Sequence, residues 1–150
     1  MFDLLHSINK DRIYLYLFRG LAIASPLVLW LYRGDMLLSM AVTRNFAFRI
    51  IVDILVLLYV LIFINNTSYR PRISLSFILM VGIWVLYLVS SLVNNSFLWS
   101  FWGDYTRMDG LLGMGHLIAY WYVLTQVFRE EREWHMFWQV VIFVGFGSGL

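Results

Sequence analysis

The sequence predicts an all-α protein, a polytopic bundle of transmembrane helices with about five spans and a cytoplasmic N-terminus. Of its 150 residues, 61% are hydrophobic and 13% are charged, whereas soluble domains carry about 25% charged residues. The mean hydropathy is +0.76. The apolar residues form runs close to the roughly 20 residues that a helix needs to cross a bilayer. These runs predict a single transmembrane domain over residues 1–150, with spans at about 13–31, 46–64, 73–93, 110–128 and 134–150.

Composition also limits the classes of function. The net charge of +2 is small and no Lys/Arg cluster occurs, so nucleic acid is not an expected partner. The absence of Cys excludes disulfides, thiolate zinc sites and Cys nucleophiles. The three His residues are too scattered for a metal motif, and neither a metal nor another cofactor is expected. No cleavage site follows the mixed residues 1–10, so the first apolar run is expected to stay as a membrane helix.

The first predicted span, 13–31, contains two residues that are unusual in a membrane helix. Arg19 lies about two turns from its start, close enough for its charge to reach the interface. Pro26 removes a backbone donor and predicts a kink. The following connector, 33–45, is semi-apolar and is expected to enter the interface as a short amphipathic piece.

The second and third spans differ in charge. Span 46–64 carries Arg49 and Asp53, an i,i+4 pair on one helix face. The polar segment 65–72 predicts a turn-forming loop. Span 73–93 has no formal charge.

Residues 97–112 form an aromatic-rich connector that concentrates charge at Asp104, Arg107 and Asp109. Such aromatic residues favour the membrane–water boundary, and Gly103 and Gly110 permit tight turns. We expect a surface segment that leads into a helix, with Arg107 directed at an anion. The alternative is an interfacial connector whose Arg binds only lipid phosphate.

The last two spans are separated by the charged turn 129–133. Span 110–128 has small glycines for close helix approach and then His116. Span 134–150 reaches the last residue without a polar flank, which favours a fragment of a longer protein.

Orientation follows from the Lys/Arg bias of the loops. With five spans, the side of the N-terminus holds six basic residues, Lys10, Arg12, Arg70, Arg72, Arg129 and Arg132. The other side holds three, Arg33, Arg44 and Arg107. The N-terminus is therefore predicted to be cytoplasmic and Arg107 to face outward.

Four ionisable residues then gather at the depth of the outer leaflet. Arg49 lies about one turn below the outer surface and Asp53 and His116 about two turns, while Arg107 precedes the fourth span. Because an ionisable group in a membrane must be paired or face water, a shared outward cavity is the prediction. Two alternatives stay open: Arg49 and Asp53 only neutralise each other, or His116 is a neutral packing residue.

The chain shows no catalytic motif of the hydrolase, phosphate-loop or zinc-protease kinds, so no catalytic residue is assigned.

One segment does carry a resemblance. SFWGDYTRMDGLL at 100–112 precedes an apolar run and REEREW at 129–134. It resembles the N-terminal part of bacterial O-antigen ligase/polymerase-like membrane proteins, in the branch with an S-[FL]-W-G-x-x-x-R-x-x-G-L segment. NFAFRIIVD at 45–53 is similar to that branch's aromatic-Arg-x-x-x-acid helix start, and YRP at 69–71 matches its short loop. The resemblance covers roughly 43–139.

The resemblance implies a multi-pass protein of the bacterial inner membrane that transfers a glycan from an undecaprenyl-diphosphate carrier at the outer face. Such proteins use no nucleotide or metal, and their catalytic His lies in a large external loop of the second half. It implies that this chain supplies a supporting wall of the site, with Arg107 toward the carrier diphosphate. Membrane lipid, the undecaprenyl-diphosphate-linked glycan and the remaining helices of the full-length protein are then the partners. Arg49, Asp53 and His116 complete the expected substrate-binding set.

Two other classes of function remain. The chain fits the helical part of a transporter or channel with an outward-facing polar vestibule. It also fits a structural membrane subunit that packs with partners. An inverted repeat of the five spans in the full-length protein would favour the transporter.

Overall fold

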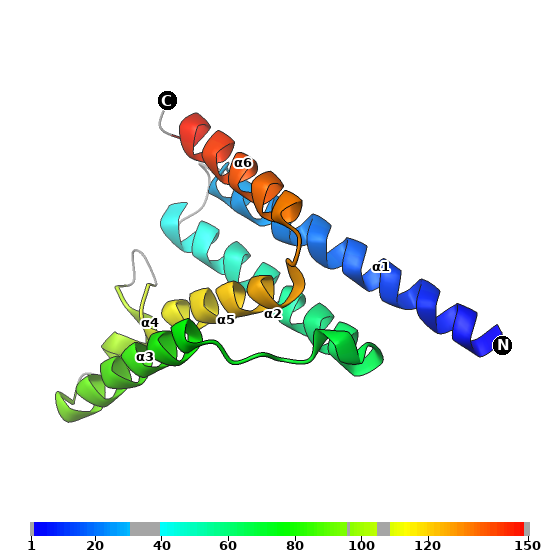
Figure 1. Cartoon of the computed structure of the whole chain (residues 1–150). Helices are drawn as coiled ribbons and strands as arrows, with labels where there is room; N and C mark the ends of the chain where they lie inside the picture. The colour runs from blue at the N-terminus through cyan, green and yellow to red at the C-terminus, as the bar shows by residue number, and fades with distance from the viewer. Residues whose placement is uncertain (1, 31–39, 96, 105–108, 149–150) are drawn as a thin grey trace.

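The computed structural model describes residues 2–30, 40–95, 97–104 and 109–148, and all its regular elements are helical. Within these ranges the chain forms six α-helices and two short 3-10 helices (Figure 1). Their bounds are α1 Phe2–Ala24, η1 Ser25–Trp30, α2 Met40–Asn65, η2 Thr67–Tyr69, α3 Leu75–Val93, α4 Phe97–Trp102, α5 Leu111–Val127 and α6 Glu131–Ser148. The predicted all-α class is confirmed.

Three helical segments are long and apolar enough to cross a membrane. They are Arg12–Trp30, Val42–Asn65 and Leu75–Val93. The remaining two long helices differ from them in length or charge, because α5 has 17 residues and α6 begins with Glu131-Arg-Glu. The structure therefore supports a membrane protein with transmembrane helices.

The first span changes helix type where the sequence predicts a kink. α1 ends at Ala24 and η1 begins at Ser25, one residue before Pro26. A proline cannot donate to the helix ladder, and its ring disfavours the α conformation in the residue before it. The Ser25 hydroxyl donates to the Ala22 carbonyl over 2.8 Å and so satisfies an acceptor at the break.

The second span begins earlier than predicted. α2 starts at Met40 rather than at Phe46, so the expected connector 33–45 is wrong for its last residues. Residues 40–45 contain neither Gly nor Pro, and nothing in them stops the helix from extending toward its N-terminus. This extension places Arg44 and Asn45 on a long regular helix.

The helices run alternately between two ends of the bundle. We call one the basic end, made of residues 66–72 and 128–133, and the other the aromatic end, made of η1, the first turns of α2, α4 and the start of α5. At the basic end, the Gln126 side chain bonds both the N–H and the C=O of Arg72, at 2.9 and 3.0 Å. At the aromatic end, Trp84 donates to the Leu111 carbonyl at 2.9 Å and Trp30 to the Val144 carbonyl at 3.2 Å.

The core lies where α1, α2, α5 and α6 meet. Its members are buried apolar residues, including Phe18, Leu55, Ile62, Val127 and Phe137. α5 contacts both α2 and α3 (Figure 1). α3 buries only Ser91 among its described residues, so it is a peripheral helix in this chain.

The described residues of the stretch 97–112 form a short helix and bring Gly103 beside Gly110. α4 is followed by Gly103 at a φ of +77°, which side-chain-bearing residues rarely adopt. A Cβ at Gly103 would lie 2.4 Å from the backbone nitrogen of Gly110, which is the N-cap of α5. The turn predicted at these two glycines is confirmed. Arg107 lies outside the described residues.

The predicted charged turn 129–133 is partly helical, because α6 begins at Glu131 rather than at Trp134. Glu133 explains this start. Its Oε2 accepts the backbone N–H groups of Arg129 and Glu130 over 2.9 and 3.2 Å. These are donors that the first turn of a helix leaves unpaired.

Candidate functional site

The structure brings two of the predicted site residues together across neighbouring helices. Asp53 on α2 and His116 on α5 face each other, with Oδ1 and Nε2 separated by 3.4 Å. The Asp53 side chain is 71% exposed and that of His116 19% exposed. The pairing of Asp53 is therefore interhelical, which the i,i+4 spacing with Arg49 does not reveal.

The hydrogen bond on the other ring nitrogen defines how this pair holds its proton. His116 Nδ1 lies 2.7 Å from the Leu112 carbonyl oxygen, which can only accept, so Nδ1 carries a hydrogen. Nε2 then faces the carboxyl group of Asp53. The two groups attract each other when a proton lies between Nε2 and Oδ1, and such a pairing lowers the cost of placing both in a membrane.

Asp53 lies farther from the start of its helix than the sequence predicts. The apolar segment runs from Val42 to Asn65, so Asp53 is near its centre. At 1.5 Å per residue this is about 17 Å from Val42 and about 18 Å from Asn65. The sequence-based distance of about two turns started the helix at Phe46, whereas α2 starts at Met40.

Arg49 lies about one turn from Asp53, toward the aromatic end. It is 7% exposed and lines a cavity of about 110 Å³ between α2 and the start of α5. Asp109, which is exposed, lines the same cavity, as do Asn45 and Gly113. A buried guanidinium and a carboxylate thus share one small space close to the Asp53–His116 pair.

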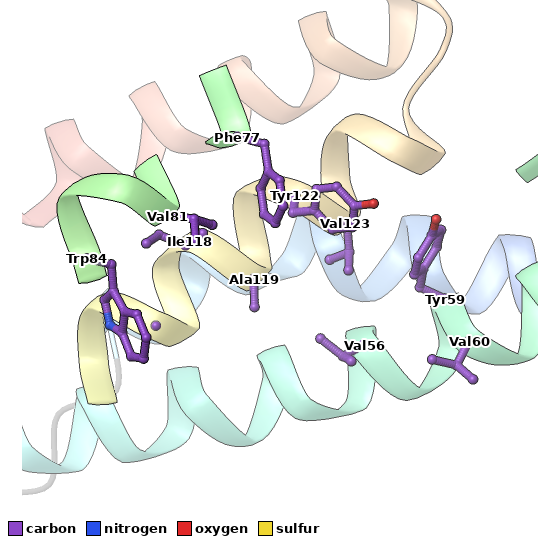
Figure 2. A pocket seen from close by; sticks show the side chains of 11 residues that line it. Val56, Tyr59, Val60, Phe77, Val81, Trp84, Ile118, Ala119, Tyr122 and Val123 are labelled. Atoms are coloured by element: carbon purple, nitrogen blue, oxygen red, sulfur yellow. The ribbon is translucent and has the colours of Figure 1, made fainter. Parts of the chain in front are cut away.

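A larger groove adjoins this polar cluster. It has a volume of about 470 Å³ and lies between α2, α3 and α5 (Figure 2). Its walls are Val56, Tyr59 and Val60 from α2, Phe77, Val81 and Trp84 from α3, and Gly115, Ile118, Ala119, Tyr122 and Val123 from α5.

The groove presents an almost wholly apolar surface. Two of its polar wall groups have partners within the protein, since Trp84 donates to the Leu111 carbonyl and the Tyr59 hydroxyl to the Tyr69 carbonyl at 3.2 Å. Asp53 and His116 are not among its wall residues, but Gly115 precedes His116 and Val56 lies three residues after Asp53. The α2–α5 interface therefore carries an apolar groove and, next to it along both helices, a polar cluster.

Sequence reasoning missed the groove. The available signal was the small side chain of Gly115, which was interpreted only as a site of close helix approach.

Arg44 was also missed as a site residue because it was assigned to the connector. It lines a further cavity of about 310 Å³ at the aromatic end.

Within the described ranges, no three His, Asp or Glu side chains gather as a metal site. Of the predicted binding residues, the structure therefore places Arg49, Asp53 and His116 in one region of the α2–α5 interface. Comparison with known protein families, curated proteins and solved structures finds no match to this chain.

Proposed function

We propose that this chain is the N-terminal membrane portion of a glycan ligase or polymerase of the bacterial inner membrane. The full protein would transfer sugar chains from an undecaprenyl-diphosphate carrier at the outer face. Two findings support the proposal: the resemblance of residues 100–112 and the polar cluster next to an apolar groove.

The observation that carries the proposal is that an apolar groove and a polar cluster lie next to each other along α2 and α5. A lipid-linked sugar donor has a long apolar chain and a diphosphate, and each part needs a different surface. The groove of about 470 Å³ offers apolar contact to a segment of the chain. Arg49, on the neighbouring cavity, offers a cation toward the aromatic end. In this arrangement the carrier diphosphate lies near Arg49 and Arg107.

The residues would act in binding rather than in bond cleavage. Arg49 and Arg107 bind the diphosphate, since a guanidinium can bind two phosphate oxygens in a fixed geometry. The Asp53–His116 pair places polar groups next to the groove. The catalytic loop is supplied by the remaining helices of the full-length protein, and no residue of this chain is assigned a catalytic role.

The proposal includes five spans with the N-terminus in the cytoplasm. It is supported by the alternation of the helices between the two ends, with the α2–α3 and α5–α6 connections both at the basic end. It is also supported by the excess of Lys and Arg there. The aromatic end, with the polar cluster, then faces outward.

The test is a glycan transfer assay on the full-length protein in membranes. Arg107→Lys should lose much of the activity and Arg107→Ala nearly all, because an ammonium cannot replace the fork of a guanidinium. Ala119→Trp should raise the KM for the carrier by filling the groove. Leu79→Trp is the matched control, because Leu79 is 59% exposed on α3 and is not a groove residue.

Full transfer by well-expressed Arg107→Ala and Ala119→Trp proteins would refute the proposal. Loss of activity in Leu79→Trp as well would mean that bulk on α3 disturbs the bundle, and the groove would then lose its support.

A second function is favoured by one specific observation, the Asp53–His116 pair at the centre of a membrane-spanning segment. Ionisable pairs at that depth are typical of transporters that carry protons. A transporter or channel with an outward polar vestibule would show proton flux in liposomes that falls in Asp53→Asn. Absence of flux, together with carrier binding, favours the transferase.

A further inference from the structure

The cavity of about 310 Å³ at the aromatic end differs from the proposed carrier site. It lies between η1, the start of α2, α5 and α6, on the other side of Asn45 and Phe48 from the Arg49 cavity. Arg44 is the one charged residue among its described lining residues. The cavity therefore carries a positive charge with apolar walls around it.

Arg44 has a buried group without a partner. Its Nε is inaccessible to solvent and makes no hydrogen bond to the part of the chain that the structure describes. A guanidinium cannot lose its proton at any ordinary pH. A partly buried guanidinium whose Nε has no acceptor among the described residues is unfavourable, so an anion in the cavity would stabilise it.

The hydroxyl groups of the cavity wall are engaged with each other. Ser25 and Tyr120 are hydrogen-bonded at 2.5 Å, and Ser25 donates its own proton to the Ala22 carbonyl. Tyr120 is consequently the donor in the pair. Both hydroxyl protons are used within the protein, so Arg44 is the charged donor that the described cavity wall offers to an anion.

The cavity begins where two apolar segments end, and Leu117 and Tyr120 continue its wall along α5. Trp30 is the last residue of the first apolar segment, and Val42, two residues before Arg44, is the first residue of the second. Both segments thus end beside the cavity. Lipid phosphates lie at this boundary of a bilayer, and aromatic residues such as Trp30 favour it.

We propose that this cavity binds the phosphodiester headgroup of an anionic phospholipid, with Arg44 binding its phosphate oxygens. The apolar walls, which include Leu29 and Val141, then contact the glycerol and upper acyl carbons. A free phosphate ion fits less well, because apolar walls cannot replace its hydration shell. The site requires neither the carrier nor glycan transfer and stands independently of the proposed function.

Native mass spectrometry of the purified full chain tests the site, with phosphatidylglycerol, uncharged diacylglycerol and inorganic phosphate as probes. Arg44→Gln should weaken phosphatidylglycerol binding by about tenfold or more, since charge-assisted hydrogen bonds to phosphate are lost. Diacylglycerol binding should not change. Arg132→Gln removes the same charge from an exposed position on α6 and should leave both affinities unchanged.

A second variant covers the case in which Arg44→Gln fails to fold. Val141→Trp keeps every charge but fills the cavity, and it should also weaken phosphatidylglycerol binding. Asp35→Asn tests whether the Asp35 carboxylate is the counter-ion of Arg44. Asp35 lies outside the described residues, and its replacement should not change phosphatidylglycerol binding.

Four results would overturn the proposal. They are unchanged phosphatidylglycerol binding in Arg44→Gln, an equal loss in Arg132→Gln, tight binding of inorganic phosphate with no lipid preference, or stronger lipid binding in Asp35→Asn. The last would show that Arg44 already has its counter-ion within the chain.

Discussion

At the basic end of the bundle, Glu133, Gln126 and Arg129 bind other side chains or the backbone, whereas at the aromatic end Arg44 and Arg49 line cavities. Glu133 is 5% exposed and binds in two directions. One oxygen accepts the backbone N–H groups at the start of α6, and the other lies 2.5 Å from Arg19 Nε. The Arg19–Glu133 contact is an ion pair but not a hydrogen bond, because Arg19 Nε makes no hydrogen bond to the described residues.

The loops of the basic end are fastened in the same way. Arg129 lies 4.3 Å from the centre of the Tyr69 ring and donates to the Ser68 carbonyl. Gln126, buried within α5, bonds both backbone groups of Arg72. These contacts join α2, α3, α5 and α6 and give Glu133, Gln126 and Arg129 partners within the protein, whereas Arg70 at the same end lines a cavity of about 510 Å³.

The aromatic end has a different character. Arg49 and Asp109 line one cavity, Arg44 lines another, and the Asp53–His116 pair borders the apolar groove. A charged side chain of a membrane helix that lines a cavity, such as Arg49, is a candidate for binding. A charge that fastens a neighbouring helix or loop, such as Arg19, points to stability.

The largest expected effect concerns the positions of the two ends. A reporter that is active only outside the cytoplasm should work when fused after Tyr105, which lies outside the described residues, and fail when fused after Ser68 at the basic end. The physical reason is the positive-inside rule. The reverse pattern would place the cavities in the cytoplasm and would end the proposal of an outward carrier site.

The next effect concerns stability at the basic end. Glu133→Gln removes the counter-ion of Arg19 and weakens the cap of α6, and we expect a loss of about 3–5 kcal/mol in unfolding free energy. Glu131→Gln on the same helix is the matched control, since Glu131 is exposed. Unfolding in mixed detergent micelles measures both. A stability equal to the control would show that the pair contributes little and would weaken the contrast between the ends.

These two ends also separate what the sequence can predict from what it cannot. Helix content, the break at Pro26 and the glycine turn at Gly103 follow from local chemistry, and the structure confirms them. The neighbourhood of Asp53 and His116 was predicted from depth in the spans, because residues at equal depth can meet.

Contacts that depend on how a helix is rotated about its own axis could not be predicted from the sequence. Depth does not show which face of α2 meets α5, so the partner of Asp53 was left open between Arg49 and a shared cavity. The Arg19–Glu133 pair joins residues far apart in the chain and has no local signature. Arg44 was missed because a boundary error at the start of α2 took it out of the helix.

A smaller effect is expected at the turn between α4 and α5. Gly103→Ala puts a side chain at a φ of +77° and a Cβ 2.4 Å from the Gly110 nitrogen. We expect a loss of at least about 1–3 kcal/mol from backbone strain. Gly20→Ala is the control, since no atom lies within 4 Å of a Cβ there. Equal stability of the two variants would show that the turn tolerates rearrangement.

The smallest expected effect is the most informative about the aromatic end. Two double-mutant cycles in detergent measure the coupling free energy of Asp53 with His116 and of Asp53 with Arg49. Each residue is replaced by Leu, singly and in pairs. Because the Asp53 side chain is 71% exposed and its contact with His116 spans 3.4 Å, we expect a coupling free energy of about 1 kcal/mol in the first cycle. The second cycle should show less, since the structure pairs Asp53 with His116.

The readouts of these variants separate a structural pair from a functional one. If Arg49 and Asp53 only neutralise each other, the Arg49→Leu/Asp53→Leu protein should fold and transfer glycan as the wild type does. If they belong to the outward cavity, it should fold normally but lose transfer, because a leucine pair keeps the helix apolar while removing the cation from the cavity. A stronger coupling to Arg49 than to His116 would contradict the interhelical pair. Asp53 would then be paired with Arg49 within α2, whereas charged residues of the basic end contact residues of other helices and loops.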